Sequence, residues 1–173
     1  DLTGQEAKIH NALLEAIERV LTGPMDAAMK ALTLCLPSEE YLADRAAQRG
    51  LVDMTDIHLR RQAVKRLLGQ ALDSQWRAVS SQSVVGSPYS ASAHEIGVRS
   101  LRHLALDYLL AAQSASLTQA EQLLESADNL TDRLAALRWI AQYANGAQRE
   151  QTLANFYDRW KRESLVVNQW FTV

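Results

Sequence analysis

Helix-breaking residues are rare in this chain, and their scarcity constrains the fold more than any other feature. The 173 residues include only seven glycines and three prolines. Between these breaks, apolar residues recur at every third or fourth position, which places them on one face of an α-helix. The clearest such set is Leu101, Leu104, Ala105, Tyr108, Leu109 and Ala112. The sequence therefore predicts an all-α protein built from amphipathic helices.

The turn signals divide the chain into about eight or nine antiparallel helices joined by short connections. The first is expected from Gln5 to Leu21 and the second from Met25 to Leu34. Ser38 is a natural N-cap for a third helix that ends before Gly50. Residues 53–81 are read as one long helix, and residues 81–90 as the longest polar loop. The later helices are expected around residues 101–112, 118–126, 131–143, 149–160 and 164–171.

The ends of the later helices carry their own signals. Thr118 is followed three positions later by Glu121, which is the spacing of a capping box. A cap is expected near Thr131, with Gly146 just after the end of that helix. Ser164 is positioned to cap the last helix.

The architecture predicted from this order is a single helical domain over residues 1–173. Its apolar fraction of 47% is ordinary for a globular protein with a real core. No exact repeat is present, but the alternation of helix pairs resembles a HEAT- or armadillo-like superhelical array. A globular helix bundle is the competing architecture. The side chains expected in the core are Trp76, Leu101, Leu104, Tyr108, Leu153, Phe156 and Trp160.

Charge and cysteine content exclude several classes of protein. The formal net charge is −2, so no overall field draws the chain to nucleic acid or to an anionic membrane. The apolar runs are too short for a transmembrane helix, and residues 1–10 lack the basic start and apolar stretch that a signal peptide is expected to have. The lone Cys35 allows no internal disulfide and is interpreted as a buried, inert thiol. We expect a cytoplasmic protein with no membrane partner.

The densest basic run lies between His58 and Arg66. One interpretation of this run is a helix that binds nucleic acid. That interpretation predicts binding to DNA or RNA that weakens steeply as the salt concentration rises. A solvated helix face is the preferred interpretation, because the rest of the chain is not basic. We therefore expect no nucleic-acid partner.

Catalytic and metal-binding patterns are incomplete in this sequence. His94 and Glu95 begin like the zinc-peptidase motif His-Glu-x-x-His, but the final position is Val98. His103 and Asp107 are one helical turn apart and could pair, yet no nucleophile is beside them. We predict no catalytic residue and no metal ligand.

Several stretches, in order along the chain, resemble the C-terminal helical domain of bacterial aminopeptidase N, a zinc metallopeptidase family. They are residues 31–44 (ALTLCLPSEEYLAD), 97–109 (GVRSLRHLALDYL), 128–137 (DNLTDRLAAL) and 156–171 (FYDRWKRESLVVNQWF). The resemblance implies a fragment of a larger, multidomain enzyme that removes N-terminal amino acids from peptides. It implies zinc in a catalytic domain that is absent here and no cofactor in the fragment itself.

The same resemblance implies partners and a role. The partners would be the catalytic domain of the same chain and, in the parent enzyme, the peptide substrate. The fragment would form a wall of the substrate cavity and limit access to it. Arg149 is the basic residue expected to face that cavity, and a solvated residue at the start of a helix is the alternative interpretation of Arg149. Trp170 and Phe171 would form an apolar patch that drives self-association of the fragment. The alternative is a stand-alone helical-repeat scaffold that grips a partner peptide in a concave groove.

Overall fold

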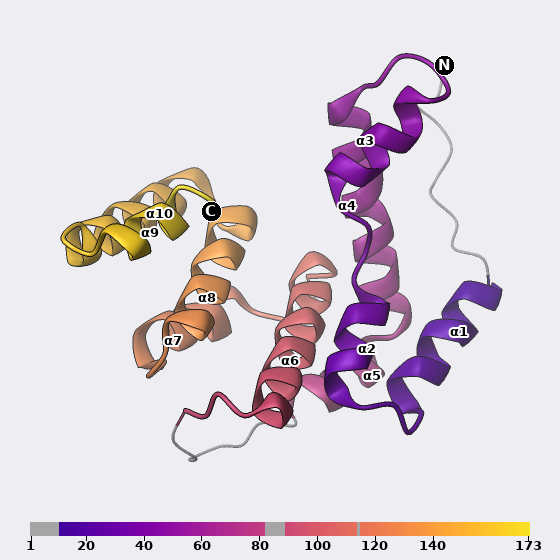
Figure 1. Cartoon of the computed structure of the whole chain (residues 1–173), viewed down its shortest axis with the longest axis horizontal. Coiled ribbons are helices and arrows are strands. Elements are labelled where there is room, and N and C mark those ends of the chain that lie inside the picture. The colour runs from indigo at the N-terminus through magenta and orange to yellow at the C-terminus, as the bar shows by residue number, and fades with distance from the viewer. Residues whose placement is uncertain (1–10, 82–88, 114) are drawn as a thin grey trace. The chain divides into compact units, whose positions relative to one another are not determined.

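A computed structural model describes residues 11–81, 89–113 and 115–173, and in these ranges every regular element is a helix (Figure 1). The predicted start of the first helix, residues 5–10, and most of the predicted polar loop lie outside the described residues. The described helices are α1 (Asn11–Thr22), α2 (Ala27–Leu34), α3 (Glu39–Ala47), α4 (Met54–Ala71), α5 (Asp73–Ser80), α6 (Ala93–Ala111), α7 (Leu117–Ser126), α8 (Leu130–Tyr143), α9 (Gly146–Trp160) and α10 (Ser164–Trp170). The all-α prediction is confirmed.

The prediction of one long helix over residues 53–81 is wrong. The chain breaks at Leu72, whose φ of −118° and ψ of 30° are not helical. Two features stabilise this break. Leu72 becomes buried, and the Trp76 indole Nε1 donates a hydrogen bond of 3.1 Å to the Leu68 carbonyl. Asp73 then stands in the first turn of α5, where the helix dipole favours a carboxylate.

The N-caps of the helices agree only in part with the sequence signals. Ser38 caps α3 as predicted, because its side chain accepts a hydrogen bond from the Tyr41 amide. The capping-box prediction at Thr118 is wrong, since α7 is capped two residues earlier by Ser116, which accepts from the Thr118 amide. The cap of α8 is Asn129 rather than Thr131.

Gly146 was expected to follow the end of α8, and this is also incorrect. Asn145 accepts a hydrogen bond from the Gln148 amide and so caps α9, which makes Gly146 the first residue of α9. Asn is a better N-cap than most residues, and its signal outweighs that of the adjacent glycine. Ser164 is likewise the first residue of α10, with Glu163 in the cap position.

Contacts between helices divide the chain into two compact units. Helices α1 to α6 form the first unit, and α7 to α10, together with residues 89 and 90, form the second. A single domain over residues 1–173 stays a prediction.

The core of the first unit is centred on two aromatic rings. Trp76 and Tyr108 stack with ring centroids 4.4 Å apart and planes inclined by 12°. Both are essentially inaccessible to solvent, and the Tyr108 hydroxyl donates to the Leu34 carbonyl at 2.9 Å. One stack and one hydrogen bond thus connect α2, α5 and α6. Of the other predicted core residues on α6, Leu101 is buried and Leu104 is half-buried.

Two glycines allow helices of the first unit to approach closely. A β-carbon on Gly69 of α4 would lie 2.2 Å from the Tyr108 carbonyl oxygen and 2.8 Å from the Ala112 β-carbon, both near the end of α6. A β-carbon on Gly97 would lie 2.9 Å from the Ala28 amide nitrogen of α2. At each of these crossings, atoms of the neighbouring helix occupy the space that a side chain in place of the glycine would need.

The second unit has a smaller core between α8, α9 and α10. The buried members are Leu134, Leu137, Phe156 and Val166. The predicted core residues Leu153 and Trp160 pack against this cluster but remain half-buried. The Trp170 indole donates to the Leu153 carbonyl at 3.1 Å and so holds α10 on α9.

Candidate functional site

The metal-binding prediction concerns His, Cys, Asp and Glu side chains. Among the residues that the structure describes, no three of these groups are placed to hold a metal ion together. His94 lies exposed in the first turn of α6, and Asp107 accepts a hydrogen bond of 2.7 Å from the buried Lys65. The described residues therefore offer no zinc site, and the zinc that the resemblance assigns to a separate catalytic domain stays a prediction.

Cys35 is exposed, so its interpretation as a buried thiol is wrong. Leu34 is the last residue of α2 and is buried, whereas Cys35 follows it with extended backbone angles (φ −68°, ψ 127°). The change of backbone direction at the helix end takes the thiol out of the core. Its sulfur lies 3.6 Å from the Leu36 carbonyl oxygen.

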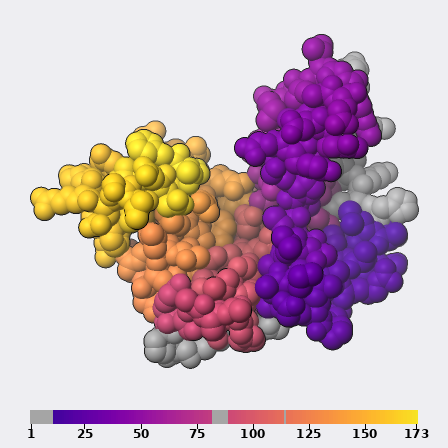
Figure 2. Space-filling view, in the orientation of Figure 1, coloured from indigo at the N-terminus to yellow at the C-terminus, as the bar shows by residue number. Residues whose placement is uncertain are grey.

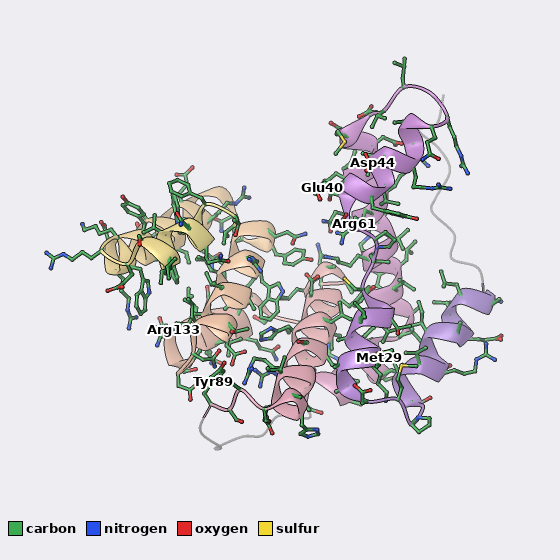
Figure 3. All side chains as sticks on the ribbon, viewed as in Figure 1. Met29, Glu40, Asp44, Arg61, Tyr89 and Arg133 are labelled. Atoms are coloured by element: carbon green, nitrogen blue, oxygen red, sulfur yellow. The ribbon has the colours of Figure 1, made fainter. Side chains whose placement is uncertain are left out.

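The basic run between His58 and Arg66 is largely occupied by partners within the chain. Lys65 is buried against Asp107, and Arg61 on α4 (labelled in Figure 3) donates to the Pro37 carbonyl at 2.8 Å. The Arg60 guanidinium is 2.7 Å from Asp56, and this hydrogen bond raises the Arg60 pKa. His58 contacts Glu39 at 2.9 Å. These four side chains therefore have partners within the chain, and they do not form a free basic stripe.

An apolar groove lies beside α3 and α4. It has a volume of about 340 Å³ and lies next to Arg61. Its apolar lining is Leu36, Pro37, Leu42, Ile57 and Val64. Among the features described so far, this groove is the one that fits the alternative function, a scaffold that binds an apolar segment of a partner peptide.

Arg149 lies in the first part of α9 and is exposed. Its Nη2 donates to the Ala144 carbonyl at 3.3 Å, just beyond the end of α8. Carbonyls at a helix end lack partners within the helix, so this contact ties α9 to the turn before it. The position leaves the guanidinium accessible to a ligand.

Aromatic and aliphatic side chains remain exposed along α9 and α10. Phe171 is 73% exposed and Leu165 is 79% exposed, whereas Trp170 is half-buried. The Trp170 ring contacts both Tyr157 and Phe171, with centroids 5.2 Å apart in each pair. The residues of α10 form part of the visible surface in Figure 2 (yellow). Self-association through this surface stays a prediction.

A second pocket, which the sequence did not indicate, is lined by α7, α8 and α9. Its volume is about 340 Å³, and it contains two glutamates and two arginines, Glu121, Glu125, Arg133 and Arg159, around Trp160. Arg133 is labelled in Figure 3. Glu121 and Glu125 are four residues apart on α7, which places them on one face of that helix, whereas Arg133 lies on α8 and Arg159 on α9. Only the packing of three helices shows that these faces meet.

Comparisons with known proteins relate this chain to one domain family and to aminopeptidases. A family model described as "Domain of unknown function (DUF3458_C) ARM repeats" matches residues 1–173. The chain is 29% identical to aminopeptidase N of Caulobacter vibrioides over 84% of its own length and 17% of that protein. It is 27% identical to aminopeptidase N of Haemophilus influenzae over 98% of its length and 19% of that protein.

A solved structure agrees with these sequence matches. Legionella pneumophila aminopeptidase A, crystallised in complex with aspartic acid, superposes with a TM-score of 0.79 at 19% identity, over 98% of this chain and 21% of that one. The predictions of an armadillo-like helical array and of a resemblance to the aminopeptidase helical domain are confirmed. The chain spans less than a fifth of the length of the curated relatives. Among the described helices, none is both long and apolar enough to cross a membrane.

Proposed function

The chain belongs to the family of ARM-repeat domains described as DUF3458_C, and from this membership we propose that it is a non-catalytic helical domain of a cytoplasmic zinc aminopeptidase. In this proposal the helices form one wall of the cavity that holds the peptide, and they limit which substrates enter. The zinc and the residues that activate water belong to a catalytic domain elsewhere in the same polypeptide. The observation that carries the proposal is that 84% and 98% of this chain match under a fifth of each of two aminopeptidases.

The gene around the chain gives the first test. The proposal expects a His-Glu-x-x-His segment upstream in the same open reading frame, since that motif supplies two zinc ligands and a general base. A reading frame without this motif would overturn the proposal and leave the scaffold alternative.

Arg149 provides a test of the cavity wall in the whole enzyme. Its exposed guanidinium at the start of α9 is free to bind a peptide carboxylate. Arg149→Gln is expected to raise KM for longer peptides more than for a dipeptide, with kcat little changed, because uniform binding is lost. Arg162→Gln, an exposed substitution after α9, is the matched control. Equal effects on long and short peptides would remove Arg149 from the cavity.

The groove beside α3 and α4 favours the second candidate function, a scaffold for a partner peptide. Its lining is almost wholly apolar, as expected for a site that takes aliphatic side chains. Leu42→Glu would place a charge in this groove and abolish such binding. The same change would leave aminopeptidase activity of the whole enzyme intact if the groove is unrelated to the cavity.

A further inference from the structure

Asn145 and Gly146 join α8 to α9, and together they form a sequence step that is open to chemical change. The chain has asparagines at positions 11, 129, 145, 155 and 168. Asn145 is the one that precedes a glycine, and no aspartate of the chain does so. Because glycine has no side chain to crowd its own backbone nitrogen, that nitrogen can approach the preceding asparagine side chain.

Both groups that would react are exposed to water. Beyond the chain neighbours of Gly146 and its own helix, no atom lies within 4 Å of the position that a β-carbon would take there. Gly146 is the first residue of α9, so its backbone N–H has no acceptor within the helix. The Asn145 side-chain nitrogen has no hydrogen-bond partner among the described residues. The attacking nitrogen and the nitrogen that must leave are therefore both free.

One hydrogen bond acts on the Asn145 side-chain carbonyl. Its oxygen accepts from the Gln148 amide at 3.0 Å. A donor at this oxygen stabilises the negative charge that develops there when a nucleophile attacks Cγ. The same bond caps α9 and restrains the side chain, but helix ends open at little cost in free energy. We therefore expect the side chain to be released without unfolding of the whole chain.

We propose that Asn145 is a site of spontaneous deamidation in the folded protein. The Gly146 backbone nitrogen loses its proton to hydroxide and attacks Asn145 Cγ, and the side-chain nitrogen takes a proton from water and leaves as ammonia. Water then opens the five-membered succinimide that results. Breaking the new bond between Cγ and the Gly146 nitrogen gives aspartate. Breaking the original peptide bond gives isoaspartate, in which the chain continues through the side chain.

The two products have different effects on α9. Aspartate keeps an oxygen at the cap and adds a negative charge at the helix start, where the helix dipole favours it. This carboxylate lies four residues before Arg149, the spacing at which opposite charges pair. Isoaspartate adds a methylene to the backbone and moves the cap oxygen away from the Gln148 amide. The proposal does not rest on the function proposed above, because the reaction needs only the junction and water.

Asn129 is a matched internal control, because it caps α8 as Asn145 caps α9. Its side-chain oxygen accepts from the Asp132 amide at 2.9 Å. Leu130 follows it, and its side-chain nitrogen donates to the carboxylates of Asp128 and Asp132. If the cap position alone decided the rate, both asparagines would change together. The proposal expects the change at Asn145 and not at Asn129.

Incubation of the folded protein at mildly alkaline pH, followed by tryptic digestion and mass spectrometry, tests the proposal. Trypsin cleaves after Arg138 and Arg149, so the peptide of residues 139–149 contains Asn145 as its one asparagine. Relative to an unincubated sample, this peptide is expected to gain the mass difference between an amide and a carboxylic acid and to elute as two products. The rate is expected to rise with pH, because the attacking nitrogen must lose its proton.

Gly146→Ala changes an exposed position with room for a β-carbon, so the fold is retained. Crowding of the attacking nitrogen is expected to slow the reaction by about tenfold. Protein denatured in urea serves as the positive control, since it has no cap at Asn145. If Asn145 reacts in urea but not in the folded protein, the proposal is overturned. Equal rates at Asn129 and Asn145, or a Gly146→Ala variant that reacts as fast as the parent, overturn it too.

Discussion

Gly69→Ala tests the close crossing of α4 and α6. The new β-carbon would lie 2.2 Å from the Tyr108 carbonyl oxygen, a distance that real contacts do not reach. It would also lie 2.8 Å from the Ala112 β-carbon. Both atoms are fixed to the α6 backbone, so the clash cannot be relieved by rotating a flexible side chain. The helices must move apart, and the nearby stack of Trp76 on Tyr108 would be disturbed.

Two opposing effects decide the magnitude. Overpacking a core costs about 1–3 kcal/mol, and a clash with backbone belongs at the upper end of that range. Alanine is favoured over glycine inside a helix by about 0.5–1 kcal/mol. The net loss of unfolding free energy is therefore about 2 kcal/mol, which corresponds to a fall in Tm of about 4–8 °C for a chain of this size. Urea denaturation followed by circular dichroism measures the loss.

Gly146→Ala is the matched control. Nothing lies within 4 Å of a β-carbon at this position, which is exposed at the start of α9. The substitution should be neutral or should stabilise the chain by up to about 1 kcal/mol through the unfolded state. If Gly69→Ala is as stable as the parent, or if the two variants shift together, the α4–α6 crossing is not as close as described.

Two further predictions concern buried polar groups of the first unit. Asp107→Asn leaves the buried Lys65 ammonium without its counter-charge, and we expect it to lower the free energy of unfolding by about 3 kcal/mol in urea denaturation. Adding Lys65→Met should recover most of that loss, because no buried charge then remains unpaired. A loss that the second substitution does not recover would contradict the pairing of Asp107 with Lys65. Burial raises the pKa of Tyr108 well above its ordinary value of 10.0, so its contribution to stability is complete below pH 10 and declines as the pH rises further. The difference in unfolding free energy between the parent and the Tyr108→Phe variant should therefore become smaller above pH 10. A difference that stays constant with pH would contradict this effect of burial on Tyr108.

The sequence predicted the helices better than their ends. Apolar spacing is a local property of each helix, so the stripe around Leu101 and Tyr108 predicts a helix there, but α6 begins eight residues before that stripe, at Ala93. The break at Leu72 depends on the Trp76 indole reaching a carbonyl two turns earlier, and no local spacing signals it. At Thr118 and Gly146 two neighbouring signals competed, and Ser116 and Asn145 prevailed because their side chains accept from backbone amides.

The candidate sites were harder to predict than the fold. The apolar neighbours of Cys35 predict one continuous buried run, but the chain changes direction after Leu34 and exposes the thiol. The pocket around Trp160 requires α7, α8 and α9 to meet, and a single sequence does not specify which faces of separate helices adjoin. Arg159 and Glu125 therefore read as ordinary surface charges until the packing is known.

Burial is distributed unevenly between the two units. The largest fully buried side chains of the first unit include Trp76, Tyr108 and Leu68, which hold α6 against α4 and α5. In the second unit Phe156 is buried, but Trp160 and Trp170 are only partly covered, and Phe171 is 73% exposed. Local stability follows the density of buried apolar contacts. The first unit is therefore expected to be the more stable of the two, whereas α9 and α10 leave apolar surface exposed, as the proposed packing against a second domain requires.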